Sequence, residues 1–178
     1  MNAAIPLIET ARLRLHGHRL EDFADCAAMW ADVGVVRHIG GRPFSAEESW
    51  GKILRYAGLW SLLGFGYWAI EEKASGRFAG EVGFADFKRE IAPSFAGAPE
   101  IGWALTPWAQ GNGLATEAVG AAVAWGDERL AAARTVCMID PENAASIRVA
   151  EKCGYREFAR TTYKGQPTIL YERTGFAR

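Results

Sequence analysis

The sequence predicts a mixed α/β (α+β) fold with about six to seven strands and about four helices. Short runs that alternate apolar and polar residues, separated by Gly-containing turns, are typical of half-buried antiparallel strands. Longer runs repeat apolar residues every three to four positions, as on one face of a helix. A length of 178 residues without a linker or low-complexity tract favours a single domain over 1–178.

The first half of the chain is expected to form a strand, two helices and three strands, at residues 12–18, 20–32, 45–64, 66–72, 77–87 and 99–107. Ser45 and Glu48 have the spacing of a capping box and fix the start of the second helix. A short Gly-containing turn makes the next two strands a hairpin. The long stretch 88–99 is rich in Gly, Ala and Pro, and we interpret it as a surface excursion that overhangs the functional site.

The second half is expected to form a helix, a strand, a helix and a terminal hairpin, at residues 114–130, 134–140, 143–154, 155–165 and 167–175. The first of these helices places Leu114, Ala118 and Trp125 on one face. Asn143 is a good N-cap for the second, and Gly154 lies just past its end.

Composition argues against several classes of function. With 20 Lys and Arg against 21 Asp and Glu, the chain has no strong basic block of the kind that nucleic-acid or membrane-surface binders usually carry. No segment approaches 18 consecutive apolar residues, and the first residues do not resemble a secretion signal, so we expect a cytoplasmic protein. A homodimer is compatible with these features.

The cysteines and histidines do not form a recognisable metal motif. Three scattered cysteines, an odd number, predict reduced thiols in the core or at the surface: Cys26, Cys137 and Cys153. The histidines His16, His18 and His38 are not grouped with acidic residues at metal-ligand spacing. We therefore expect no metal.

The stretch "PWAQGNGLATEA" at 107–118 suggests a phosphate cradle at a helix start, because glycines there expose bare backbone. A nucleotide P-loop is excluded, since Leu114 and Ala115 stand where Lys and Ser or Thr are required. A dinucleotide fingerprint would need Gly or Ala at Thr116, and Asp140 lies too far along the chain for its ribose contact. The remaining pattern, Gln/Arg-x-x-Gly-x-Gly/Ala, is matched by Gln110, Gly113 and Ala115.

With this motif the chain resembles the GNAT superfamily of acyl-CoA-dependent N-acetyltransferases, and the predicted element order agrees with that fold over nearly the whole length. The resemblance implies a mostly antiparallel central sheet and acetyl-CoA as co-substrate. Its pyrophosphate would lie on the backbone of Gln110, Gly111, Asn112, Gly113, Leu114 and Ala115. Its pantetheine arm would lie beside a splayed strand at Trp103, Ala104 and Leu105. The segments "PEIGWALTPWAQGNGLATEAV" and "NAASIRVAEKCGY" look like the branch that acetylates ribosomal-protein N-termini.

The same resemblance suggests the catalytic groups. Glu100 opens its strand ten residues before Gln110, close to where many relatives place a glutamate base, although a solvent-facing carboxylate is the alternative. Many relatives use a late-helix tyrosine as the acid, but Ala150 occupies that position here. The branch motif N-x-x-S is matched by Asn143 and Ser146, which implies a cofactor contact for both and an acid role for Ser146.

We therefore expect an enzyme that acetylates a primary amine, either a protein N-terminus or a small molecule, by direct attack in a ternary complex. The alternative is a non-catalytic acyl-CoA-binding regulatory module. Residues 35–44 and 88–98 are expected to select the acceptor, and no motif in them indicates which amine it is.

Overall fold

The computed structural model describes residues 4–175 and contains one eight-stranded sheet in the order β1-β2-β3-β4-β5-β6-β8-β7. The strands are β1 Ile8–Glu9, β2 Leu13–Gly17, β3 Tyr67–Glu72, β4 Phe78–Ala85, β5 Glu100–Leu105, β6 Arg134–Ile139, β7 Arg156–Tyr163 and β8 Gln166–Thr174. All neighbouring strands are antiparallel except β5 and β6. The sheet has one strand more than the upper predicted number of seven, because the two-residue strand β1 was not predicted.

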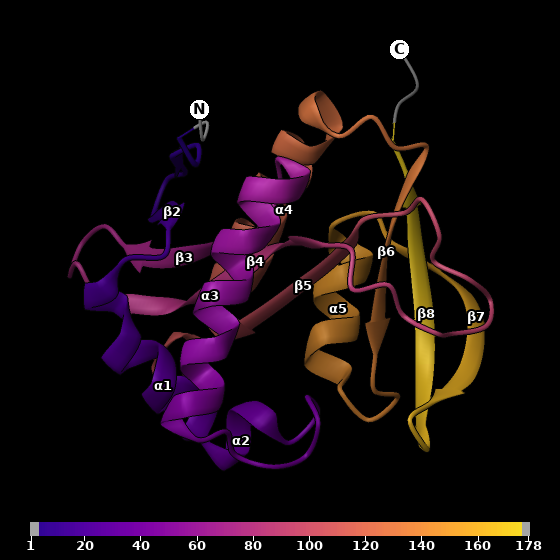
Figure 1. Cartoon of the computed structure of the whole chain (residues 1–178), viewed down its shortest axis with the longest axis horizontal. Coiled ribbons are helices and arrows are strands. Elements are labelled where there is room, and N and C mark those ends of the chain that lie inside the picture. Colours follow the sequence, from indigo (N-terminus) through magenta and orange to yellow (C-terminus); the bar gives the residue numbers. More distant parts are fainter. Residues whose placement is uncertain (1–3, 176–178) are drawn as a thin grey trace.

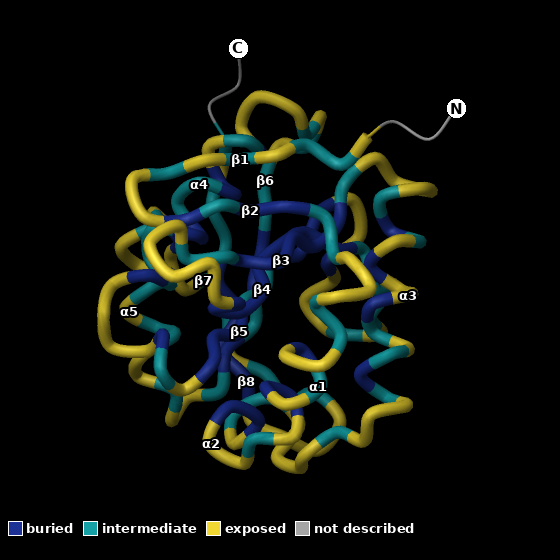
Figure 2. The backbone as a smooth tube through the Cα atoms, turned by 90° about the vertical axis from the view of Figure 1, so that its left-hand side faces the viewer, coloured by how far each residue is buried: buried dark blue, intermediate teal, exposed yellow. Residues whose placement is uncertain are grey.

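Two groups of helices cover the two faces of the sheet. They are α1 Phe23–Ala31, α2 Val33–Val36, α3 Ala46–Leu63, α4 Leu114–Arg129 and α5 Ala144–Lys152, with short 3-10 turns at Leu20–Asp22 and Pro107–Ala109. Figure 2 shows α1 and α3 on one side of the strands and α4 and α5 on the other. The prediction of about four helices omitted α2, because the helix expected over 20–32 divides into a 3-10 turn and α1, and α2 follows as a separate single turn.

The central strands are buried because both faces of the sheet are covered. All eight residues of β4 are buried, a pattern expected of strands between two helical layers. In β5, Ile101 and Leu105 join the core cluster that contains α4, whereas Ala104 packs with α1 and α3 residues. Strand alternation therefore sends neighbouring β5 side chains to opposite layers.

The sheet divides between its two parallel strands. Strands β4 and β5 are paired through six residue pairs, but β5 and β6 share only the pair Glu100–Val136 at their beginning. Figure 1 shows the two strands separating toward their C-terminal ends. The expected splay is therefore present, and beyond its first residue the β5 edge has no strand partner on that side within residues 4–175.

The excursion 88–99 packs on the outer half of the sheet, and its first part contacts the start of β5 through Arg89 and Glu100. Its buried residues Phe95 and Ala98 pack with Val136 of β6 and Leu170 of β8. Apolar burial against the outer half of the sheet thus holds this segment. Among residues 4–175, no helix combines the length and apolarity needed to cross a bilayer.

Candidate active site

The glycine stretch forms an exposed loop at the C-terminal end of β5. Gly111 and Gly113 both have φ of +78°, a conformation that other residues adopt only with strain. Gly113 is the N-cap of α4 and supplies no side-chain cap. The first N–H groups of α4 have no partner within the helix, so they remain available to an anion. The residues present therefore suit a bound phosphate group.

Gln110 joins this loop to the end of β5. Its side-chain amide donates a hydrogen bond to the Leu105 carbonyl at 2.9 Å, so this side chain holds the strand end and leaves the loop backbone free. Trp103 is half-buried and packs against the core cluster that contains α4. The predicted loop and strand residues thus form one continuous edge from β5 to α4.

Glu100 lies where β5 and β6 are still paired, and it is engaged by a residue that the sequence did not indicate. Arg89, from the excursion, donates Nε–H to one carboxylate oxygen at 2.5 Å and Nη2–H to the other at 2.8 Å. The Glu100 side chain is only 9% exposed. The structure therefore does not support the alternative that Glu100 simply faces solvent.

The start of α5 has the predicted N-cap. The Asn143 Oδ1 atom accepts a hydrogen bond from the Ser146 N–H at 3.0 Å, which makes Asn143 the N-cap. The Ser146 hydroxyl has no hydrogen-bond partner within residues 4–175. Ala150, at the position where many relatives have tyrosine, is fully buried in the core below α4. Because Ala150 has no hydroxyl group, Ser146 is the candidate hydroxyl donor in this helix.

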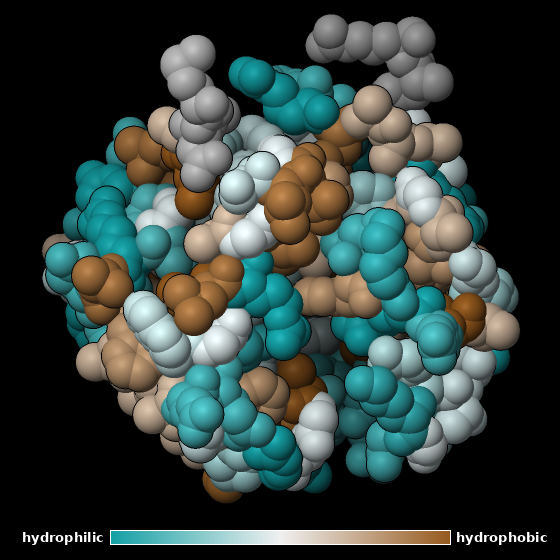
Figure 3. Space-filling model, viewed as in Figure 1, coloured by the Kyte–Doolittle hydropathy of each residue, from teal (hydrophilic) through white to brown (hydrophobic). Residues whose placement is uncertain are grey.

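A histidine–aspartate pair connects the segment after α2 with the end of β6. His38 follows α2, and its Nδ1 atom lies 2.9 Å from Oδ2 of Asp140, which follows β6. Burial favours a higher pKa for Asp140, but hydrogen bonds from the Glu142 backbone and His38 outweigh it and lower that pKa. Figure 3 shows a hollow in the middle of this face of the molecule, between the α2 side and the α5 side.

Comparison with known proteins agrees with this geometry. Residues 12–156 match the acetyltransferase (GNAT) domain family. The chain belongs to the GNAT family of acetyltransferases. The family match makes it an acyltransferase and confirms the resemblance and the fold predicted from the sequence.

Individual relatives show the same relationship. The uncharacterized protein YkkB of Bacillus subtilis is 34% identical over 64% of this GNAT chain and 63% of YkkB itself. A putative GNAT-family acetyltransferase from Bordetella pertussis is 30% identical, with a TM-score of 0.83 over 95% of this chain and 99% of that one. The RimL ribosomal L7/L12 alpha-N-protein acetyltransferase, solved with coenzyme A, has a TM-score of 0.75 at 19% identity over 95% and 98%. At that identity the likeness to RimL concerns the fold.

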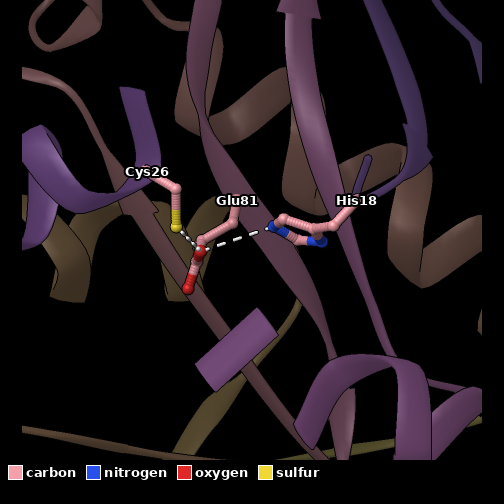
Figure 4. A group of neighbouring side chains, drawn as sticks. All are labelled: His18, Cys26 and Glu81. Atoms are coloured by element: carbon pink, nitrogen blue, oxygen red, sulfur yellow. Dashed lines mark hydrogen bonds and ion pairs between the residues drawn. The ribbon is translucent and has the colours of Figure 1, made fainter. Parts of the chain in front are cut away.

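A buried polar cluster lies on the α1–α3 face of this GNAT sheet, beside β5. Figure 4 shows His18, Cys26 and Glu81 directed toward one another. Oε2 of Glu81 lies 3.6 Å from His18 Nε2 and 3.7 Å from Cys26 Sγ, and Tyr56 donates its hydroxyl hydrogen to the other oxygen. The three residues come from separate elements, so their spacing in the sequence gave no sign of the cluster.

The cluster keeps a buried carboxylate charged and a buried thiol protonated. Burial favours a higher pKa for Glu81, but contacts with His18, Lys52 and Tyr56 outweigh it and lower that pKa. Burial and the neighbouring Glu81 charge raise the pKa of Cys26. All three cysteines are free, as predicted. Because its pKa is raised, the buried Cys26 thiol is expected to be unreactive.

The Glu81 contribution to stability is expected to depend on pH. Because folding lowers its pKa, the contribution is complete above the ordinary glutamate value of about 4.3 and is lost as pH falls through the folded-state value. The difference in unfolding free energy between wild type and Glu81→Gln, from urea denaturation, should be largest near neutral pH and shrink in acid. Glu128→Gln, at an exposed position, is the control, and its difference in unfolding free energy should hardly change with pH. If the difference for Glu81→Gln is also independent of pH, Glu81 does not stabilise the fold as a buried carboxylate.

Proposed function

We propose that this protein transfers the acetyl group of acetyl-CoA to a primary amine within a ternary complex. The observation that carries the proposal is the unpaired edge of β5, which leads directly into the exposed glycine loop at the start of α4. An extended arm can pair with such an edge as an added strand, while the loop binds the attached phosphates. The reaction requires no metal.

The proposed cofactor contacts are mainly with backbone. Around the phosphates they come from Gln110, Gly111, Asn112, Gly113, Leu114 and Ala115, and along the arm from Trp103, Ala104 and Leu105. Leu114 is buried, so its N–H rather than its side chain would make the contact. One N–H on the β5 edge would polarise the thioester carbonyl, because a fixed donor stabilises charge that develops there.

Glu100 is the proposed proton acceptor for the attacking amine. Its low exposure means that it would act through water rather than by touching a bulky acceptor. Arg89 already donates to both carboxylate oxygens, and it therefore fixes the orientation of the carboxylate at the point where β5 and β6 separate. Each oxygen retains a lone pair that can accept a further hydrogen bond.

At the other side of the opening, α5 would assist the departing thiolate. Its N-terminus carries partial positive charge, and Asn143 orders its first turn. Ser146 would donate a hydrogen bond to the sulfur as the carbon–sulfur bond breaks. The proton lost by the amine would pass through water to Glu100, which returns it to solvent, and the departing thiolate would take its proton from water.

Ser146→Ala is expected to lower turnover about tenfold, because a hydrogen bond to a charged group is worth about 1.5–3 kcal/mol before solvent replaces part of it. Alanine is a better helix former than serine, so the change should not weaken α5. The measurement is single-turnover thiol release at saturating acetyl-CoA. Wild-type rates under these conditions would remove Ser146 from the proposal and leave water as the acid.

The acceptor is proposed to approach from the α1–α3 side, where His38 after α2 contacts Asp140 after β6. Both a protein N-terminus and a small-molecule amine present the required primary amine. The fold shared with RimL supports the first, since RimL is an alpha-N-protein acetyltransferase. The formal net charge of −1 supports an acceptor other than nucleic acid.

A thiol-release screen tests the proposed function. Purified protein is incubated with acetyl-CoA and a panel of peptides with free N-termini, the same peptides with blocked N-termini, and small primary amines. Release of free CoA that depends on an unblocked amine and persists after chelator treatment is expected. Tight CoA binding without release for any amine would instead indicate a non-catalytic acyl-CoA-binding module.

A further inference from the structure

The turn between β1 and β2 contacts the start of α4, about a hundred residues away in the sequence. Glu117, in the first turn of α4, accepts three hydrogen bonds from this turn. Its Oε1 accepts from the Thr10 hydroxyl at 2.6 Å and from the Arg12 backbone N–H at 2.8 Å, and its Oε2 accepts from Arg12 Nε at 2.7 Å. Both oxygens of this carboxylate are therefore occupied by one short segment.

Arg12 also contacts the glycine loop itself. Its Nη1 donates to the Asn112 carbonyl oxygen at 2.9 Å, and its Nη2 lies 3.5 Å from where a Cβ atom would stand on Gly113. In a trans peptide, the C=O of one residue and the N–H of the next point in opposite directions within one rigid plane. By holding the Asn112 carbonyl, Arg12 therefore fixes the direction of the Gly113 N–H.

The charges in this group matter to an anion bound nearby. Glu117 is a carboxylate in the first turn of α4, where an uncompensated negative charge would repel a phosphate. Burial favours a higher pKa for Glu117, but hydrogen bonds from Thr10 and Arg12 outweigh it and lower that pKa, so the group is ionised. Arg12 neutralises it at close range while orienting the loop.

We propose that Arg12, held by Glu117, is a positioning residue for the phosphate-binding loop. This inference rests on the proposed cofactor site, and it assigns to Arg12 no contact with the reacting atoms. An exposed ion pair of this kind contributes little to global stability, and the Arg12 side chain is 49% exposed. Its effect should therefore appear in cofactor affinity rather than in the unfolding midpoint.

The neighbouring Arg14 provides a matched control. It lies two residues further on, is 38% exposed, and makes ion pairs of the same kind with Glu71 at 2.6 Å and Glu9 at 3.3 Å. Within residues 4–175, its hydrogen bonds go to Glu9 and Glu71 and do not reach the glycine loop or α4. Arg14→Ala thus removes a comparable surface ion pair two residues away and leaves the loop untouched.

The experiment measures CoA affinity by calorimetry, turnover by thiol release and unfolding by thermal denaturation. For Arg12→Ala we expect the Kd for CoA to rise at least about tenfold, since bonds with a charged donor are lost. Turnover at saturating acetyl-CoA should stay near wild type, and the unfolding midpoint should match that of Arg14→Ala. Arg12→Lys should recover only part of the affinity, because an ammonium lacks the planar fork that reaches Glu117 and Asn112 together.

Two results would overturn the proposal. If Arg12→Ala binds CoA as tightly as Arg14→Ala, Arg12 does not position the loop. If adding Glu117→Gln to Arg12→Ala restores wild-type affinity, charge neutralisation alone explains the effect. Failure of the wild-type protein to bind CoA would be a different outcome, because it would overturn the proposed function together with this inference.

Discussion

Gly113→Val is expected to abolish measurable CoA binding. Valine would place a branched side chain where the first N–H groups of α4 are exposed, and an anion could no longer approach them. The backbone there has φ of +78°, which a β-branched residue adopts only with strain, so the loop would also change shape. Calorimetric titration with CoA measures the effect directly.

The matched control for this change is Gly165→Val. Gly165 has φ of +80° in the turn between β7 and β8, with open space around its Cα, so valine introduces similar backbone strain outside the glycine loop. Both variants should lose some stability, but only Gly113→Val should lose CoA binding. Wild-type affinity in a folded Gly113→Val protein would refute the phosphate site at this loop.

Glu100→Gln is expected to lower turnover by about a hundredfold or more at neutral pH, the usual range for loss of a general base. The loss should become smaller as pH rises, because the acceptor amine then loses its proton without help. Affinity for CoA should change little. The measurement is a pH profile of thiol release at saturating concentrations of both substrates.

Arg89→Lys separates a catalytic role of Glu100 from a structural one. This variant removes the bidentate geometry of the ion pair but keeps the Glu100 carboxylate and the positive charge beside it. If Glu100 accepts the proton, Arg89→Lys should be far more active than Glu100→Gln. Equal losses in the two variants, independent of pH, would mean that the ion pair holds the excursion and that water is the base.

Elements with local signals could be predicted well from the sequence. In α3, the Ser45 hydroxyl accepts from the Glu48 N–H at 3.1 Å and the Glu48 carboxylate accepts from the Ser45 N–H at 2.8 Å, as the capping-box spacing predicts. Asn143 caps α5 for the same reason: the donor lies three residues away. The short elements β1 and α2 were missed because two or four residues contain too little periodicity to recognise.

Contacts within the candidate site that depend on chain topology could not be predicted. The loop at Gln110 and Gly113 was found because its motif is contiguous. The partners Arg89 of Glu100 and Arg12 of Glu117 were not found, because the sheet order rather than sequence spacing brings them together. The packing of the excursion was not predicted for a related reason: its composition indicated a loop, but not the apolar surface that Phe95 covers.

The single residue pair between β5 and β6 also affects how the molecule unfolds. It leaves a five-stranded part, β1 to β5, joined to a three-stranded part, β6 to β8, mainly by helices, the excursion and the His38–Asp140 contact. Amide protons that face this boundary from β5 have few partners within the sheet, so their hydrogen exchange should be fast compared with that of the central strands. A ligand that completes the sheet would then slow exchange in both parts at once. Substrate binding would thereby make two loosely coupled units unfold as one.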